Sequence, residues 1–179
     1  MGEAKALLAW GGRPLVVHQC EALRGFRDVV VVVGHDAAAI EAAAALPAGA
    51  RWVENARWAE GRSTSLEAGA RALPDDAAGV LVAAVDQPLD EAVVRALVAA
   101  YRPGEHAVVE PIRGGRRGHP VLLGVGAVTA LRRAGEHDEG LRGIVRDARA
   151  RGGVVVEVGG EELNLNTPAA YRAAREEET

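Results

Sequence analysis

The sequence predicts an α/β protein, a three-layer α/β/α sandwich with a mainly parallel, Rossmann-like sheet. Apolar runs rich in β-branched residues recur along the chain, as in strands covered on both faces. Segments with helical spacing of apolar residues alternate with these runs, as in chains that pack helices on a sheet. The chain has 179 residues, of which 49% are hydrophobic and 26% are charged. This length and composition predict one domain over residues 1–179.

The first third of the chain predicts a strand–helix–strand unit preceded by a helix. The run Val29–Val33 is unbroken and β-branched, which predicts a buried strand. An alanine-rich segment that ends at Pro47 predicts the following helix. In order, the expected elements are a helix over 14–23, a strand over 29–33, a helix over 37–46 and a strand over 50–53.

The remaining sequence continues the alternation. Thr64 and Glu67 have the spacing of a capping box, which predicts the start of a helix. Asp90 and Thr167, the latter followed by proline, predict the starts of two further helices. The expected helices are 63–73, 90–101, 125–133, 141–151 and one from Pro168. The expected strands are 79–85, 107–109, 121–123 and 154–156, of which 107–109 and 121–123 could form a β-ribbon.

Charge and cysteine content exclude several classes of function. The net charge is −4 and the basic side chains are scattered, which argues against a nucleic-acid partner. Cys20 is the only cysteine, so neither an intramolecular disulfide nor a thiolate metal cluster is expected, and a reducing, cytoplasmic location fits. No uninterrupted apolar run exceeds six residues, far short of the roughly 20 that a membrane-spanning helix needs. No membrane association is expected.

Three positions follow predicted strands and are therefore candidates for ligand binding: Gly34, Asn55 and Asp86. Ligands of open α/β sheets bind beyond the carboxyl ends of the strands. A carboxylate at this edge can hold a hard cation and, through it, phosphates. The alternative for Asp86 is a structural role, capping the turn before Pro88.

Lys5 is the only lysine among 21 basic residues, which indicates a role that a planar guanidinium does not serve. A compact ammonium is a common phosphate partner. The alternative is a solvated lysine near the chain terminus.

Gly61, Ser65 and neighbouring hydroxyls lead into a predicted helix, which suits an anion or a polar base; the alternative is plain helix capping. His119 can contact a substrate, or it is a surface residue beside a turn.

Several motifs, in order, resemble the molybdenum cofactor cytidylyltransferase branch of the molybdopterin nucleotidyltransferases. Met1-Gly2-x-x-Lys5 and Gly12-Arg13-Pro14-Leu15 resemble the second half of the family's nucleotide-binding signature. The other matching motifs are Asn55-x-x-Trp58-x-x-Gly61-x-x-x-Ser65-Leu66, Asp86-Gln87-Pro88, Arg117-Gly118-His119-Pro120-Val121 and Asn164-Leu165-Asn166-Thr167-Pro168.

The resemblance implies a nucleotide-diphospho-sugar transferase-like fold and the transfer of a nucleoside monophosphate from an NTP to the phosphate of a molybdenum-bearing pterin. It implies Mg²⁺ as cofactor, held by Asp86 and Asn166, with Lys5 and Asp86 as catalytic residues. Nucleotide binding would involve Gly2, Lys5, Gly34, Asn55, Gly61 and Ser65. Gly118, His119 and Pro120 would face the molybdopterin-type acceptor. A molybdoenzyme or a cofactor-insertion protein is an expected partner.

Two departures from the family pattern leave alternatives open. The family's first strand and glycine-rich phosphate loop precede the position of Met1, so we expect the natural chain to start upstream; the alternative is a degenerate relative that binds nucleotide or pterin without turnover. The cytidylyltransferase branch has aspartates where Asn164 and Asn166 stand, and these asparagines resemble the guanylyltransferase branch. The motifs Asp86-Gln87-Pro88 and Asn55 to Leu66 favour CTP as the substrate, whereas the asparagine pair favours the alternative, GTP.

Overall fold

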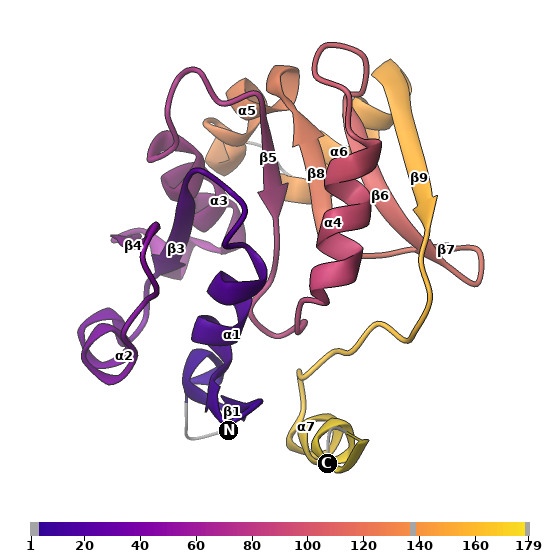
Figure 1. Ribbon diagram of the computed structural model, residues 1–179. Coiled ribbons are helices and arrows are strands. Elements are labelled where there is room, and N and C mark those ends of the chain that lie inside the picture. Colours follow the sequence, from indigo (N-terminus) through magenta and orange to yellow (C-terminus); the bar gives the residue numbers. More distant parts are fainter. Residues whose placement is uncertain (1–3, 137–138, 178–179) are drawn as a thin grey trace.

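The computed structural model describes residues 4–136 and 139–177. The protein has a five-stranded mixed sheet between two helical layers (Figure 1). Its strands are β5 (Gly79–Val82), β8 (Val121–Gly124), β6 (Val108–Arg113), β7 (Arg116–Arg117) and β9 (Gly153–Glu157). Strand β6 is central, because it pairs with β8, with β7 and with β9. The three-layer α/β/α arrangement is confirmed.

Different helices cover the two faces of this sheet. On one face, α4 (Glu91–Ala100) packs Val93 and Leu97 against Val109 and Leu122. On the other face lie α3 (Arg62–Arg71), α5 (Val125–Leu131), the short helix η3 (Ala134–Glu136) and α6 (Gly140–Gly152), which enclose a second core with Val108 and Leu123. Alternate residues of β6 and β8 thus face opposite layers, as strand geometry requires.

The predicted strand–helix–strand unit is present. Strands β3 (Val29–Val33) and β4 (Ala50–Glu54) are parallel and are connected through α2 (Ala37–Ala43). They form a separate two-stranded sheet, as do the short antiparallel strands β1 (Ala9–Trp10) and β2 (Arg13–Pro14). The remaining short helices are η1 (Lys5–Leu7) and η2 (Trp58–Glu60).

The prediction of a mainly parallel sheet is corrected by this pairing. In the five-stranded sheet only β6 and β9 are parallel; the pairs β5–β8, β6–β8 and β6–β7 are antiparallel. The reason is that residues 114–120 reverse the chain as a tight ribbon, so β8 returns beside β6 without a crossover helix. The predicted β-ribbon between residues 107–109 and 121–123 is confirmed, because β6 and β8 pair antiparallel there.

Strand β5 ends at Val82, three residues before the predicted end. Val82 pairs with Val121, and the next residue of the partner strand is Pro120. Proline has no N–H to continue the ladder. The segment after Val82 therefore leaves the sheet as a loop, and this loop carries Asp86.

Two predicted helix caps are confirmed and one is wrong. The Asp90 carboxylate accepts a hydrogen bond from Ala92 N at 2.7 Å, and the Thr167 hydroxyl accepts one from Ala170 N at 3.1 Å. The capping box of Thr64 and Glu67 is not formed, because α3 already begins at Arg62. Thr64 instead donates to backbone carbonyls, and Glu67 pairs with Arg71.

The C-terminal helix α7 (Pro168–Glu177) lies apart from the large sheet, beside the N-terminal segment (Figure 1). An extended segment after β9 leads to it. Leu165, Ala174 and Tyr171 pack with Trp10 and Leu15 of the N-terminal segment. This packing unites residues far apart in the chain. Among the described residues, no helix is both long and apolar enough to cross a bilayer.

Cys20 lies inside α1 (Leu15–Ala22) and is 2% exposed. Burial raises the pKa of Cys20 to about 11. At pH 8 we expect iodoacetamide to label the native protein at least ~100-fold more slowly than the urea-unfolded chain, because only the thiolate reacts. Mass spectrometry over time measures both rates, and equal rates would contradict the prediction. The Cys20 thiol ionises at a lower pH in the unfolded chain than in the folded protein. Its ionisation therefore lowers the free energy of unfolding as the pH rises above about 9.

Candidate active site

Three segments bring Lys5, Asp86 and Asn166 together. Lys5 begins η1, Asp86 lies on the loop after β5, and Asn166 lies on the extended segment before α7. Lys5 Nζ donates to Asp86 Oδ2 at 3.2 Å and to Asn166 Oδ1 at 2.6 Å. The Lys5 and Asp86 side chains are 32% and 18% exposed, so the cluster is accessible to a ligand. This is the convergence that the sequence predicted.

Backbone and core contacts hold the three segments in this arrangement. Leu165 N donates to Asp86 O at 2.8 Å, which ties the closing segment to the Asp86 loop. The Leu165 side chain is 1% exposed and packs in the core near Trp10. The Tyr171 hydroxyl of α7 donates to Ala9 O at 2.6 Å. Burial of its neighbour Leu165 thus helps to position Asn166, in addition to the contact of Asn166 with Lys5.

Gln19 holds the Asp86 loop from the other side, and the sequence did not predict this role. Its amide nitrogen donates to Ala84 O and to Gln87 O, both at 2.9 Å, and its Oε1 accepts from Leu89 N at 2.7 Å. Gln19 is 7% exposed. The sequence feature that could have indicated this role is a glutamine on the buried face of α1, among Leu15, Val16 and Cys20. A buried polar side chain needs hydrogen-bond partners.

The donor atoms of the cluster suit a hard divalent cation. Oδ2 of Asp86 and Oδ1 of Asn166 already converge on one cationic nitrogen, so the two oxygens can share a cation. Across residues 4–136 and 139–177, no group of three His, Cys, Asp or Glu side chains gathers to hold a metal. A cation here would take most of its ligands from water and phosphate oxygens, as Mg²⁺ commonly does.

Asn55 and Ser65 lie together at the carboxyl end of β4. Asn55 is 4% exposed, and its amide nitrogen donates to Thr64 Oγ1 at 2.9 Å and to Ser65 Oγ at 3.0 Å. Its Oδ1 accepts from Arg57 N at 3.0 Å. The amide of Asn55 thus fastens the start of α3 to β4, and the Ser65 hydroxyl remains able to donate. Gly61 has φ 118°, a conformation that side-chain-bearing residues rarely adopt.

Gly34 directly follows β3 and packs against Trp58. A Cβ atom added at Gly34 would come within 3 Å of the Trp58 side chain, so this position requires glycine. Trp58 is 45% exposed, and its ring makes an edge-to-face contact with the His35 ring, with 4.9 Å between the ring centroids. Gly2, also expected at the nucleotide site, lies outside the described residues.

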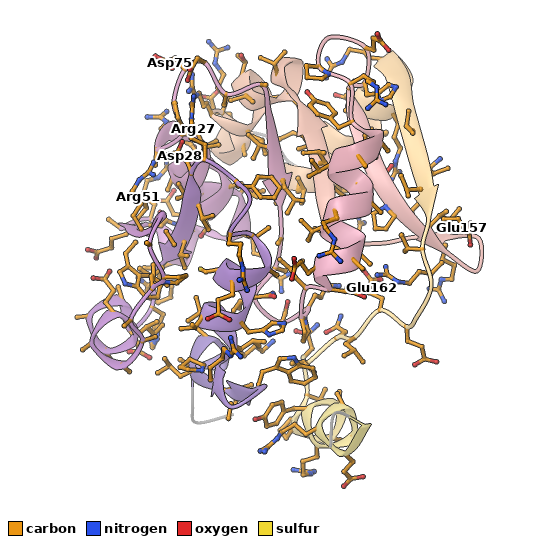
Figure 2. All side chains as sticks on the ribbon, in the orientation of Figure 1. Arg27, Asp28, Arg51, Asp75, Glu157 and Glu162 are labelled. Carbon is orange, nitrogen blue, oxygen red and sulfur yellow. The ribbon has the colours of Figure 1, made fainter. Side chains whose placement is uncertain are left out.

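Gly118, His119 and Pro120 connect β7 to β8. His119 N donates to Glu162 Oε1 at 2.6 Å, and the lack of a side chain at Gly118 allows the Glu162 carboxylate to approach. Glu162 lies on the extended segment after β9 (Figure 2). His119 and Pro120 line a cavity of about 230 Å³ that also includes Gln87 and Pro88, the residues that follow Asp86. The predicted acceptor residues therefore lie beside the Asp86 loop.

The fold and the placement of these residues define a nucleotidyltransferase of the nucleotide-diphospho-sugar transferase fold. Residues 1–152 match the MobA-like NTP transferase domain, and the chain belongs to this family.

Individual relatives extend this similarity. A curated relative, nicotine blue oxidoreductase of Paenarthrobacter nicotinovorans, is 36% identical over an alignment 155 residues long that covers 79% of this chain and 72% of the relative. The crystal structure of Rv0371c from Mycobacterium tuberculosis in complex with manganese is 25% identical, with a TM-score of 0.79 over 98% of this chain and 93% of the other. A nucleotidyl transferase from Methanothermobacter is 26% identical, with a TM-score of 0.78 over 97% and 84% of the two chains.

Proposed function

We propose that this nucleotidyltransferase transfers a nucleoside monophosphate from CTP to the terminal phosphate of a molybdenum-bearing pterin. The observation that carries the proposal is the contact of Lys5 Nζ with both Asp86 and Asn166. An oxygen of the acceptor phosphate attacks the α-phosphorus, the bond to the bridging oxygen of the β-phosphate breaks, and pyrophosphate leaves. No covalent intermediate with the protein is needed.

Phosphoryl-type transfer depends mainly on positioning and on charge stabilisation, and the site residues are suited to both. Lys5 places a positive charge against the reacting phosphates. Asp86 and Asn166 would hold a divalent cation, Mg²⁺ in this proposal, and the manganese complex of the mycobacterial relative supports a divalent cation. When bound, that cation neutralises phosphate charge. A cation held by Asp86 and Asn166 would compete with Lys5 for these two side chains. The Lys5 ammonium would then be free to contact phosphate.

The nucleotide is proposed to bind across the ends of β3 and β4. Ser65 would donate its hydroxyl to the nucleotide, and Asn55 would act by holding Ser65 in place. Gly61 would allow the backbone to lie close to the ligand, and Gly34 and Gly2 stay predicted nucleotide-binding positions. His119, with Gly118 and Pro120, would face the acceptor from the cavity beside the Asp86 loop.

The choice between CTP and GTP is tested by thermal unfolding with each nucleotide and MgCl₂. A ligand that binds only the native state stabilises it, so CTP at about 100 times its dissociation constant should raise the Tm by roughly 5–10 °C. We expect a smaller shift with GTP at the same concentration. A larger shift with GTP would favour the guanylyltransferase alternative, to which Asn164 and Asn166 point. A shift without pyrophosphate release in the presence of acceptor would favour the non-catalytic alternative.

A redox activity is a second candidate, because the relative at 36% identity carries the name of an oxidoreductase. The same purified protein is assayed with nicotine blue and a series of two-electron reductants. Dye reduction without pyrophosphate release would favour this candidate over nucleotidyl transfer.

A further inference from the structure

The cavity beside the Asp86 loop is lined by Arg113, a half-buried cation to which the proposed reaction assigns no role. Arg113 is the last residue of β6 and lines the cavity with His18, Gln87, His119 and Glu162. Its Nε and Nη1 atoms are buried and have no hydrogen-bond partner among the described residues. Leaving such donors unpaired costs free energy, and more for a charged group than for a neutral one. A bound ligand would explain why the cost is tolerated.

Neighbouring acidic groups do not pair with Arg113. Glu162 lines the same cavity, but its Oε1 accepts from His119 N. Asp90, also in the lining, accepts from Ala92 N at the start of α4. Within the described part of the chain, no carboxylate lies within ion-pair distance of Arg113, although Arg117 on the same ribbon pairs with Glu110 at 3.0 Å. Arg113 is the one arginine or lysine in the described lining.

A second unpaired group lines the same space. Nδ1 of His119 is buried and also has no hydrogen-bond partner among residues 4–136 and 139–177. A guanidinium presents N–H groups in a planar fork that matches two oxygens of a phosphate. A neighbouring imidazole nitrogen adds a further contact to an oxyanion. The two groups together are therefore suited to one phosphate-sized anion.

We propose that Arg113 and His119 bind the phosphate of the acceptor substrate in this cavity. The inference rests on the proposed function, because it names the residue that positions the attacking phosphate. Gln87 and Pro88 line the cavity and directly follow Asp86 in the chain, so an anion held here lies beside the loop that carries the catalytic carboxylate. Arg113 thus selects acceptors with a phosphate group.

The test compares Arg113→Gln with Arg116→Gln. Arg116 is opposite Arg113 on the same ribbon and is exposed, so this variant removes an equal charge outside the cavity. Inorganic phosphate is titrated while the Tm is followed. The wild type and Arg116→Gln should show equal phosphate-dependent rises, and Arg113→Gln should show none. Arg113→Lys, which keeps the charge but loses the fork, should show an intermediate rise. An equal rise in Arg113→Gln and wild type overturns the inference, as does a rise that Lys5→Gln abolishes and Arg113→Gln leaves unchanged.

Steady-state kinetics separate this inference from the proposed function. With transfer established, Arg113→Gln should raise the acceptor KM at least tenfold and leave the CTP KM unchanged, since a lost ground-state contact appears in KM. Unchanged acceptor KM overturns the role of Arg113 and leaves the proposed function standing. Absence of transfer in the wild type, together with Arg113-dependent phosphate binding, supports an anion site and rejects the proposed function.

Discussion

Asp86→Asn is expected to lower the rate of nucleotidyl transfer by roughly 10²–10³-fold, the effect of removing one group that stabilises transition-state charge. Asparagine has the shape of aspartate but no charge. Asp86 is the one carboxylate that contacts Lys5 in the described structure, so the variant removes the anionic oxygen that would hold the divalent cation. Nucleotide-dependent Mn²⁺ binding, measured by calorimetry, should weaken in parallel.

Asp75→Asn is the matched control for this substitution. Asp75 precedes β5, whereas Asp86 follows it, and Figure 2 shows Asp75 at the upper left of the molecule, away from Glu162. Its side chain is 95% exposed and pairs with Arg132, a contact worth about 0–1 kcal/mol. The control should retain wild-type rates. Equal activity of Asp86→Asn and Asp75→Asn would contradict the assignment of Asp86.

Gln19→Leu is expected to destabilise the protein by about 2–4 kcal/mol, because it leaves the N–H of Leu89 and the carbonyl of Gln87 without a partner and removes one of two hydrogen bonds to the carbonyl of Ala84. The free energy of unfolding in urea measures the change. Release of the Asp86 loop should also lower kcat at temperatures where the variant is still folded, with a smaller change in the CTP KM.

Glu21→Gln is the control on the same helix. Its carboxylate makes a surface ion pair with Arg13, so the expected loss of stability is below about 1 kcal/mol. Gln19→Glu adds a second comparison: the carboxylate can still accept from Leu89 N but cannot donate to the two carbonyls. A Gln19→Leu variant as stable as Glu21→Gln would show that the Asp86 loop is held by other contacts.

The sequence predicted the parts of the site that depend on strand ends. Gly34 directly follows β3, as expected, because the β-branched run Val29–Val33 ends there, and Asn55 directly follows β4. Ordered motifs predicted the meeting of Lys5, Asp86 and Asn166. The early end of β5 was not predicted, because it depends on the pairing of β5 with β8: Val82 lies opposite Val121, the first residue of β8, and Pro120 precedes that strand.

The roles of Gln19 and Arg113 could not be read from local patterns. Gln19 acts on residues about 70 positions away in the chain, and only the packing of α1 against the Asp86 loop brings them together. Arg113 ends β6 and directly precedes a glycine- and arginine-rich turn, and nothing in the local sequence distinguishes it from Arg116 and Arg117. The fold buries two nitrogens of Arg113, whereas it exposes Arg116 and pairs Arg117 with Glu110.

Transfer of radiolabel from α-³²P CTP to a molybdenum-bearing pterin measures the central claim directly, with pyrophosphate counted in the same reaction. The wild-type protein should form labelled product and pyrophosphate in equal amounts. Lys5→Arg, which keeps the charge but replaces the compact ammonium between Asp86 and Asn166, should retain about 1% of this rate or less. No labelled product from the wild type, or wild-type rates in Lys5→Arg, would contradict the account.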